Sequence, residues 1–294
     1  MKSLRLRKWK STLFVLPAFL LHFAVIAIPA FTMIYYALTD WNGLNQPNII
    51  GFGNFARLFQ DRNFYDALSH NIVYMLIFLI VPLVIALCVA LPLIKLGRVQ
   101  MFYRALFFLP YVIGAPIAGK LFTILYSPYY GIPSVLTSFG IEGMENFALL
   151  NNTNLALYAV AFVDNWHWWG FVMAIILSAL HQVDPNLYEA ADIEGINPIQ
   201  KIWHITIPQI KPTLISYMMF DIMASFMTFD YIYVMTNGAP AGATEVLATY
   251  IYRNAMAGYD AAYGTTISLT VCLICIGIYF VYRFFQKKGA EKQI

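Results

Sequence analysis

Four charged side chains lie within long apolar stretches of the sequence: Lys120, Asp164, Asp221 and Asp230. An ionised side chain at the centre of a membrane helix costs about 2.5–3.5 kcal/mol on insertion scales, so such residues usually face a water-filled path or a partner. The sequence therefore predicts a hydrated path through the chain. Two structural explanations stay open: an ion pair between Lys120 and one of the aspartates, or a position at the outer membrane interface.

Asp164 belongs to a helical face that mixes polar and aromatic groups. His167, Trp168 and Phe171 follow it at i+3, i+4 and i+7, which places all four on one side of an α-helix. Carboxylate and imidazole groups form hydrogen bonds with hydroxyls, and an aromatic ring packs against the apolar face of a sugar. This face predicts contact with a sugar-like molecule. An aromatic stripe is equally typical of helix packing, and the neighbouring tryptophans could form an interfacial belt.

Two further stretches repeat this combination of side chains. They contain Tyr111 with Ala115, and Met223, Phe226, Met227 and Asp230. Residues three, four and seven positions apart share one face of a helix. We therefore expect three helices to line a single cavity.

No motif for catalysis or for metal binding occurs in the sequence. It contains neither a phosphate-binding G-x-x-x-x-G-K-[ST] loop nor an H-E-x-x-H pair, and the five histidines do not cluster. Cys272 and Cys275 have the spacing of a redox pair but lie within an apolar helix, where a thiol behaves as a small hydrophobe. We expect no catalytic residue, no metal and no cofactor in this chain.

The elements that position these residues are predicted to be membrane helices. Hydrophobic residues make up 60% of the 294 positions and charged residues 11%, against roughly 25% charged in an average soluble domain. The small net charge of +3 and the placement of the basic residues beside apolar stretches disfavour nucleic-acid binding. We predict an all-α integral membrane protein with six spans, at about 11–37, 70–94, 104–127, 154–181, 207–236 and 262–284.

The basic residues predict the orientation of the spans. Fourteen of the 18 Lys and Arg residues lie before the first span, in the 95–104 and 182–211 segments, or from Arg283 at the end of the last span onward. By the positive-inside rule both termini are expected in the cytoplasm. We predict one membrane domain over 11–285 with cytoplasmic tails at 1–10 and 286–294. The first apolar run is too long for a signal peptide, so we expect it to be retained as a helix.

The cytoplasmic segment 184–208 is predicted to form a helical elbow. Asp184 and Pro185 have the residue types of a helix N-cap and first position, and Gly195 suits a left-handed stop. Asn197 with Pro198 restarts the chain in the same way. Glu189, next to two alanines, offers a surface for docking in a groove, although a solvated interfacial helix has the same features.

This elbow resembles the EAA motif of permease subunits of ABC importers. The resemblance rests on Glu189-Ala190-Ala191, on Gly195 six positions later and on Ile205-x-Ile207-Pro208, with Ile207 replacing the usual Leu and Glu194 the common Asp. The resemblance extends over essentially the whole chain. Five further segments are similar to the carbohydrate-uptake subfamily: Leu16-Pro17-Ala18, Asn165-Trp166, Gly170-Phe171, Phe229-Asp230-Tyr231 and Thr236-Asn237-Gly238-Ala239-Pro240.

The resemblance implies a type I ABC importer permease fold in the plasma or inner membrane. It implies that Glu189, Ala190, Ala191 and Gly195 dock the elbow on a cytoplasmic ATPase, and that the corresponding helices line a sugar cavity. The implied partners are a second homologous permease, two ATPase copies that bind ATP and Mg, and an external solute-binding protein contacting the outer loops 38–69 and 236–261. The implied substrate is a sugar, an oligosaccharide or a related polyol phosphate.

Two alternatives belong to other classes. An ion-coupled secondary transporter would use Asp164, Asp221 or Asp230 as a proton relay and would need no ATPase. A membrane scaffold without transport would leave the buried charges unexplained. Neither accounts for the elbow.

Overall fold

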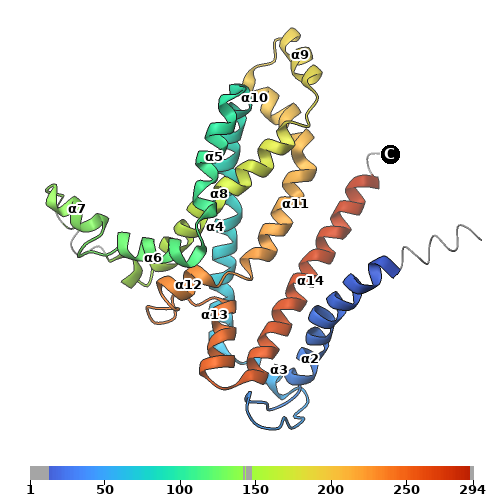
Figure 1. Ribbon diagram of the computed structural model, residues 1–294, viewed down its shortest axis with the longest axis vertical. Coiled ribbons are helices and arrows are strands. Elements are labelled where there is room, and N and C mark those ends of the chain that lie inside the picture. The colour runs from blue at the N-terminus through green and yellow to red at the C-terminus, as the bar shows by residue number, and fades with distance from the viewer. Residues whose placement is uncertain (1–12, 142, 144–147, 292–294) are drawn as a thin grey trace, which may run out of the picture. The chain divides into compact units, whose positions relative to one another are not determined.

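The computed structural model describes residues 13–141, 143 and 148–291, and this part of the chain is helical without a β-strand (Figure 1). The described residues fall into two compact units, one drawn from 1–62 and 250–276 and the other from 63–249 and 277–294. The longer helices are α2 (Ile28–Ala37), α4 (Arg62–Leu93), α5 (Val99–Val112), α6 (Ala115–Leu125), α8 (Ala156–Leu180), α11 (Ile207–Ser225) and α14 (Ala261–Glu291). The shorter helices are α3 (Gly53–Leu58), α7 (Ile132–Ser138), α9 (Pro185–Ile193), α10 (Pro198–Lys201), α12 (Asp230–Met235) and α13 (Leu247–Tyr252).

Four helices of the described part are long and apolar enough to cross a membrane. They are Leu13–Ala37, Arg62–Leu96, Ala156–Leu180 and Ala261–Phe284, and α5 with α6 makes a fifth if the bent pair counts as one span. These spans correspond to five of the six predicted ones. The predicted tail 1–10 lies outside the described residues, and the predicted tail 286–294 is described as far as Glu291, where it continues α14.

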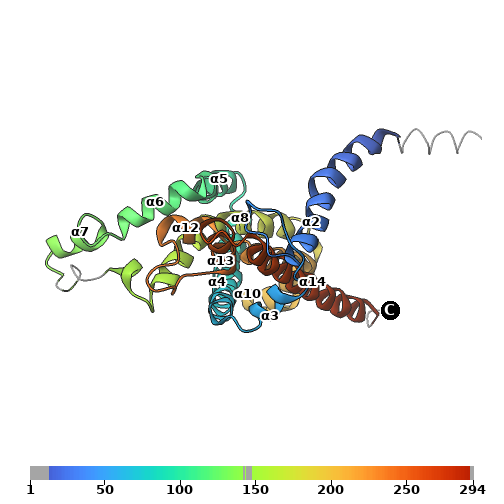
Figure 2. The same ribbon diagram turned by 90° about the horizontal axis from the view of Figure 1, so that it is seen from below.

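The third predicted span is not a single straight helix. Its two parts, α5 and α6, meet at an angle of 86°, and Figures 1 and 2 show α6 leaving sideways from the end of α5. Ile113 and Gly114 have extended backbone at the break. Pro116 lacks the N–H group that would continue the helix from Val112, which is the physical reason for the bend.

The fifth predicted span, 207–236, is also interrupted. α11 ends at Ser225 and α12 starts at Asp230. α11 contains too many polar residues to be counted among the helices that are apolar enough to cross a membrane. A tertiary contact lies at the end of α11: the buried Asn71 of α4 donates a hydrogen bond of 3.1 Å to the Ser225 carbonyl and accepts one of 3.3 Å from the Leu247 N–H.

The core of the larger unit is built around α8. This helix is apolar around most of its circumference, and 61% of its most apolar window is buried, as expected for a helix packed on several sides. One hydrophobic cluster joins α8 to α4 and α11, and a second joins it to α4, α6 and α12. The polar side chains of α8 are therefore held in a rigid, mostly apolar setting.

The smaller unit contains a polar network on its loops and helix ends. Arg57 of α3 forms an ion pair with Asp260 at 2.5 Å and stacks 3.9 Å above the ring of Tyr263. Asp61 accepts hydrogen bonds from the hydroxyls of Tyr250 and Tyr263. These contacts connect the segment after the first span to the last span.

Candidate functional site

A buried carboxylate of α8 is held by a tyrosine of α4. Asp164 is only 7% exposed, and its Oδ2 accepts a hydrogen bond of 2.6 Å from the hydroxyl of Tyr74, which is fully buried. Neither residue has a cationic partner among the described residues. The second carboxylate oxygen of Asp164 makes no hydrogen bond in this part of the chain, so it is available as an acceptor.

A second buried carboxylate lies on α11. Asp221 is 1% exposed, and its Oδ1 accepts a hydrogen bond of 3.1 Å from the indole N–H of Trp168. Its Oδ2 and the hydroxyl of Tyr231 on α12 are buried atoms without a hydrogen-bond partner among the described residues. Buried polar atoms are rarely left unpaired, so these two groups suggest that a ligand or water completes the site.

Aromatic rings surround the carboxylates. Trp168 lies with its ring centroid 5.5 Å from Phe78, 5.6 Å from Tyr111 and 4.9 Å from Phe171. Tyr111 also stacks on Phe171 at 5.0 Å. We call Tyr74, Asp164, Trp168 and Asp221, together with these rings, the path cluster.

The bend between α5 and α6 places His167 in the same region. The backbone at Ile113 is not helical, and its carbonyl oxygen lies 2.8 Å from Nε2 of His167. Because a carbonyl oxygen only accepts hydrogen bonds, Nε2 carries the proton. The His167 ring lies 5.4 Å from Tyr111, so the bend supports both side chains.

The path cluster can bind hydroxyl groups against an apolar surface. Its carboxylates accept hydrogen bonds, and its rings present flat apolar faces. The alternative explanation, an ion pair of Lys120 with an aspartate, is not supported, because Lys120 on α6 is exposed and has no ion pair in the described part of the chain. No group of His, Cys, Asp and Glu able to hold a metal occurs among the described residues.

The structure brings together only some of the predicted path residues. Tyr111 contacts the rings of His167, Trp168 and Phe171. Asp164 contacts Tyr74, whose ring stacks on Phe78 beside Trp168. Ala115, the first residue of α6, packs against the neighbouring hydrophobic cluster.

The shared face predicted for 223–230 is wrong, because the helix ends at Ser225 and the spacing no longer describes one face. Met223 is half-buried, Phe226 is buried, Met227 is 79% exposed and Asp230 begins α12 in an exposed position.

Sequence reasoning missed part of the path cluster. It did not identify Tyr74 and Phe78, which are one helical turn apart on α4. This spacing was a usable signal, since it places a polar group beside an aromatic ring on one face. Tyr231 on the short α12 gave no such signal.

The elbow has the predicted local structure. The Asp184 side chain accepts a hydrogen bond of 3.0 Å from the Asn186 N–H and caps α9, which starts at Pro185. Gly195 has a left-handed φ of +72°, and an Asn197–Gln200 capping box opens α10. These contacts satisfy the free N–H groups of both short helices.

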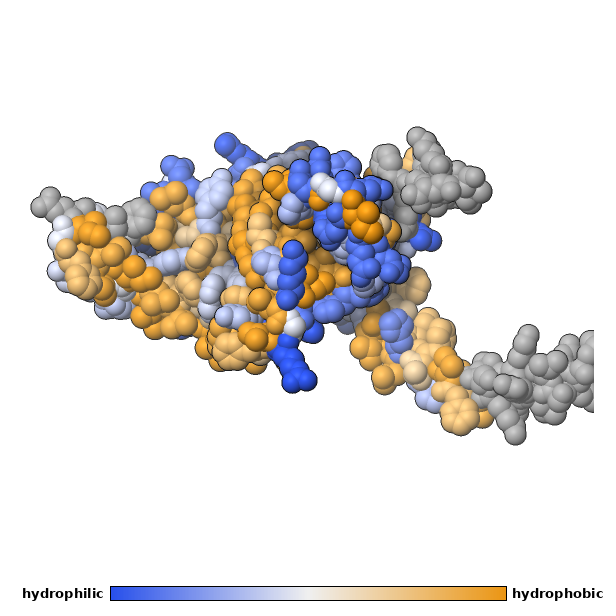
Figure 3. Space-filling model, turned by 90° about the horizontal axis from the view of Figure 1, so that it is seen from above, coloured by the Kyte–Doolittle hydropathy of each residue, from blue (hydrophilic) through white to orange (hydrophobic). Residues whose placement is uncertain are grey.

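The elbow exposes a mixed surface at one end of the larger unit. Glu189, Ala190 and Gly195 are exposed, whereas Ala191 is only 3% exposed and packs inward. Figure 3 views this end and shows hydrophilic side chains gathered beside hydrophobic ones. The exposed apolar side chains include Ile193 at 89% and Trp203 at 65%, which sequence reasoning did not single out.

Two side-chain contacts brace the elbow. The hydroxyl of Tyr188 on α9 lies 2.9 Å from the hydroxyl of Thr206, directly before α11. Asp192 of α9 forms an ion pair with Lys201 of α10. These contacts connect α9 to α10 and to the start of α11, the helix that carries Asp221.

Comparison with known proteins agrees with this architecture. Residues 49–289 match the family described as binding-protein-dependent transport system inner membrane component. The chain is 31% identical to the probable ABC transporter permease protein YurN of Bacillus subtilis over 95% of this chain and 97% of that protein. It is 28% identical to the probable starch degradation products transport system permease protein AmyD of Thermoanaerobacterium thermosulfurigenes, over 94% and 93% of the two chains.

A solved structure shares the fold. A chain of a bacterial alginate ABC transporter, crystallised in complex with an alginate pentasaccharide-bound periplasmic protein, superposes with a TM-score of 0.85 at 21% identity, covering 96% of this chain and 95% of that one. The type I importer permease fold is thereby shown. With its apolar spans, its elbow and a family match over most of its length, the chain is a multi-pass membrane protein that belongs to the binding-protein-dependent transport system inner membrane components.

Proposed function

We propose that this chain forms one half of the translocation path of an ATP-driven importer for a sugar, an oligosaccharide or a related polyol phosphate. The path cluster carries the proposal: two buried carboxylates without a cation, Asp164 and Asp221, lie among aromatic rings. This combination suits a ligand with many hydroxyls and an apolar ring face. The relatives named for starch degradation products and alginate have substrates of this chemical class.

The energy for transport is proposed to come from partner subunits. The exposed face of the elbow, with Glu189, Ala190 and Gly195, docks on a cytoplasmic ATPase that binds ATP and Mg. Ala191 supports this face from inside, because it is buried against the chain. Two ATPase copies, a second permease and an external solute-binding protein complete the assembly. Both termini then lie in the cytoplasm, on the side of the elbow.

Reconstitution in lipid vesicles tests this proposal. The chain is co-expressed with the second permease and ATPase, and labelled sugar uptake is measured with the binding protein and ATP. We expect Asp164→Asn and Trp168→Ala to lower uptake while the complex still assembles. Normal uptake by both variants would refute the assigned path.

A charge reversal on the elbow tests the coupling separately. Glu189→Arg is expected to abolish ATP-dependent uptake while sugar binding by the isolated binding protein is unchanged. Glu189→Gln is a comparison at the same position, since it removes the charge without reversing it. Uptake that needs no ATPase would instead favour the ion-coupled alternative with Asp164 and Asp221 as proton carriers.

A further inference from the structure

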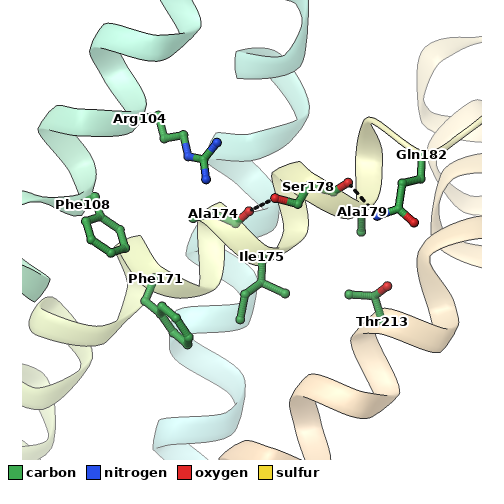
Figure 4. Close-up of a pocket in the computed structure, with 9 residues that line it drawn as sticks. All are labelled: Arg104, Phe108, Phe171, Ala174, Ile175, Ser178, Ala179, Gln182 and Thr213. Atoms are coloured by element: carbon green, nitrogen blue, oxygen red, sulfur yellow. Dashed lines mark hydrogen bonds between the residues drawn. The ribbon is translucent and has the colours of Figure 1, made fainter. Parts of the chain in front are cut away.

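A pocket of about 450 Å³ lies between three helices of the larger unit, near the elbow. Arg104 and Phe108 of α5, Thr213 of α11 and a row of α8 residues line it (Figure 4). Pockets of a few hundred cubic ångströms with mostly apolar walls and a few polar groups are typical of small-molecule sites, including sites between the helices of bundles.

The pocket continues the face of α8 that carries the path cluster. Phe171, Ile175 and Ser178 of α8, and Gln182 in the turn that follows it, line the pocket at successive spacings of four, three and four. Asp164, His167, Trp168 and Phe171 have the same kind of spacing. Phe171 belongs to both sets, so one stripe of α8 runs from the buried carboxylates to the pocket.

The pocket is amphipathic in a way that suits a polyhydroxylated ligand. Figure 4 shows the Arg104 side chain directed toward Ser178, with the Phe171 and Ile175 side chains below them in the view. Within the described residues, the Arg104 guanidinium and the Thr213 hydroxyl form neither an ion pair nor a hydrogen bond. Ser178 donates to the Ala174 carbonyl at 2.9 Å, so its oxygen can still accept a bond.

These groups complement those of the path cluster. The path cluster offers carboxylates, which accept hydrogen bonds, whereas the guanidinium of Arg104 is always charged and only donates. A ligand hydroxyl can serve as donor in the first and acceptor in the second. The pocket also lies at the elbow end of α8, since Gln182 is two positions before the Asp184 cap.

We propose that this pocket is a second sugar site, which holds the substrate at the cytoplasmic end of the path before release. The inference rests on the proposed function, because the path cluster must deliver a sugar for the pocket to receive one. Arg104 contacts sugar oxygens there, and Phe171 lies between the two sites.

Protection of an introduced thiol tests the inference. Ser178→Cys is made in the complete transporter without the three native cysteines, in vesicles that expose the cytoplasmic face. A membrane-impermeant maleimide is added without nucleotide, with or without the transported sugar. At a sugar concentration about ten times Kd, labelling is expected to slow roughly tenfold, because the occupied site is blocked most of the time.

Matched variants identify the source of protection. Ser216→Cys carries the same substitution at an exposed position of α11 outside the pocket, and its labelling is expected not to respond to sugar. Arg104→Gln is expected to raise the sugar concentration needed for half protection, whereas Arg98→Gln, in the loop before α5, leaves it unchanged. If Ser178→Cys does not assemble, Gln182→Cys replaces it.

The outcomes separate this inference from the proposed function. Uptake by the unmodified complex is measured in the same vesicles. Normal sugar uptake with identical labelling of Ser178→Cys in the presence and absence of sugar overturns the pocket and leaves the importer intact. If Ser178→Cys is labelled in detergent but not in lipid vesicles without sugar, the inference is also overturned, because lipid would then occupy the pocket. Absence of sugar uptake by the unmodified complex refutes the proposed function itself.

Discussion

The close approach of α5 and α8 at Gly170 predicts a large effect from a single methyl group. A Cβ atom at Gly170 would lie 2.1 Å from the carbonyl oxygen of Phe107 and 2.9 Å from its carbonyl carbon. Ordinary C···O contacts between helices are about 3.3 Å, so α5 and α8 would have to separate by roughly 1.2 Å. Overpacking of a core on this scale costs about 1–3 kcal/mol of folding stability.

The same separation would reach the path cluster. Tyr111 of α5 stacks on Phe171 of α8, one position after Gly170, and this contact depends on the spacing of the two helices. We therefore expect Gly170→Ala to lower both the thermal stability of the purified complex and its sugar uptake. The assay is a thermal aggregation curve in mild detergent, followed by uptake in vesicles.

Gly277→Ala on α14 is the matched control. An added Cβ there has no neighbour within 4 Å, and replacing a helical glycine by alanine favours the helix by up to about 1 kcal/mol. Stability equal to or above that of the unmodified protein is expected for this variant. If Gly170→Ala is equally stable, the close contact of α5 with α8 and the reasoning from it are wrong.

Three further predictions concern single contacts. Trp168→Phe keeps an aromatic ring but removes the N–H donor to Asp221. Leaving that buried carboxylate without its partner should cost about 1–3 kcal/mol of folding stability and reduce sugar uptake. An unchanged melting temperature and unchanged uptake would contradict the role of this hydrogen bond. Tyr188→Phe removes the hydroxyl that links α9 to the start of α11, so ATP hydrolysis should persist while sugar uptake per ATP hydrolysed falls. An unchanged ratio of uptake to ATP hydrolysis would argue against the brace. Hydrogen bonds from Asn48 lower the pKa of Asp40, so the carboxylate stabilises the 40–48 loop at neutral pH, and this effect is lost as the pH falls through the lowered pKa. Asp40→Asn mimics protonation and should therefore speed proteolysis of the loop at pH 7. Equal cleavage rates for the variant and the unmodified protein would exclude this effect.

The elbow shows how far local sequence can be interpreted. Asp184, Pro185, Gly195 and Asn197 each act on the backbone within a few positions, and the structure has the cap, the left-handed stop and the restart that their types predict. Capping and φ preferences are local properties, so no tertiary information was needed. The composition likewise determined the membrane class, because apolar stretches of about 20 residues have few other uses.

Hydropathy alone did not predict where the spans are interrupted. Apolar composition predicted 104–127 and 207–236 as continuous helices, but the first bends at Gly114 and the second ends at Ser225. Pro116 was a local signal for the bend, whereas the last carbonyl of α11 is bound by Asn71, a residue 154 positions away in sequence. Such a contact has no trace in the pattern of neighbouring residues.

The candidate site was also only partly predictable from the local sequence. Helical spacing by itself determined that Asp164, His167, Trp168 and Phe171 share one face of α8, because a helix places residues at fixed angles. Only the tertiary structure decided which groups face them: it pairs Asp164 with Tyr74 and Trp168 with Asp221, across 90 and 53 positions. Partners from other helices are selected by packing, and packing depends on the whole bundle rather than on any single stretch of sequence.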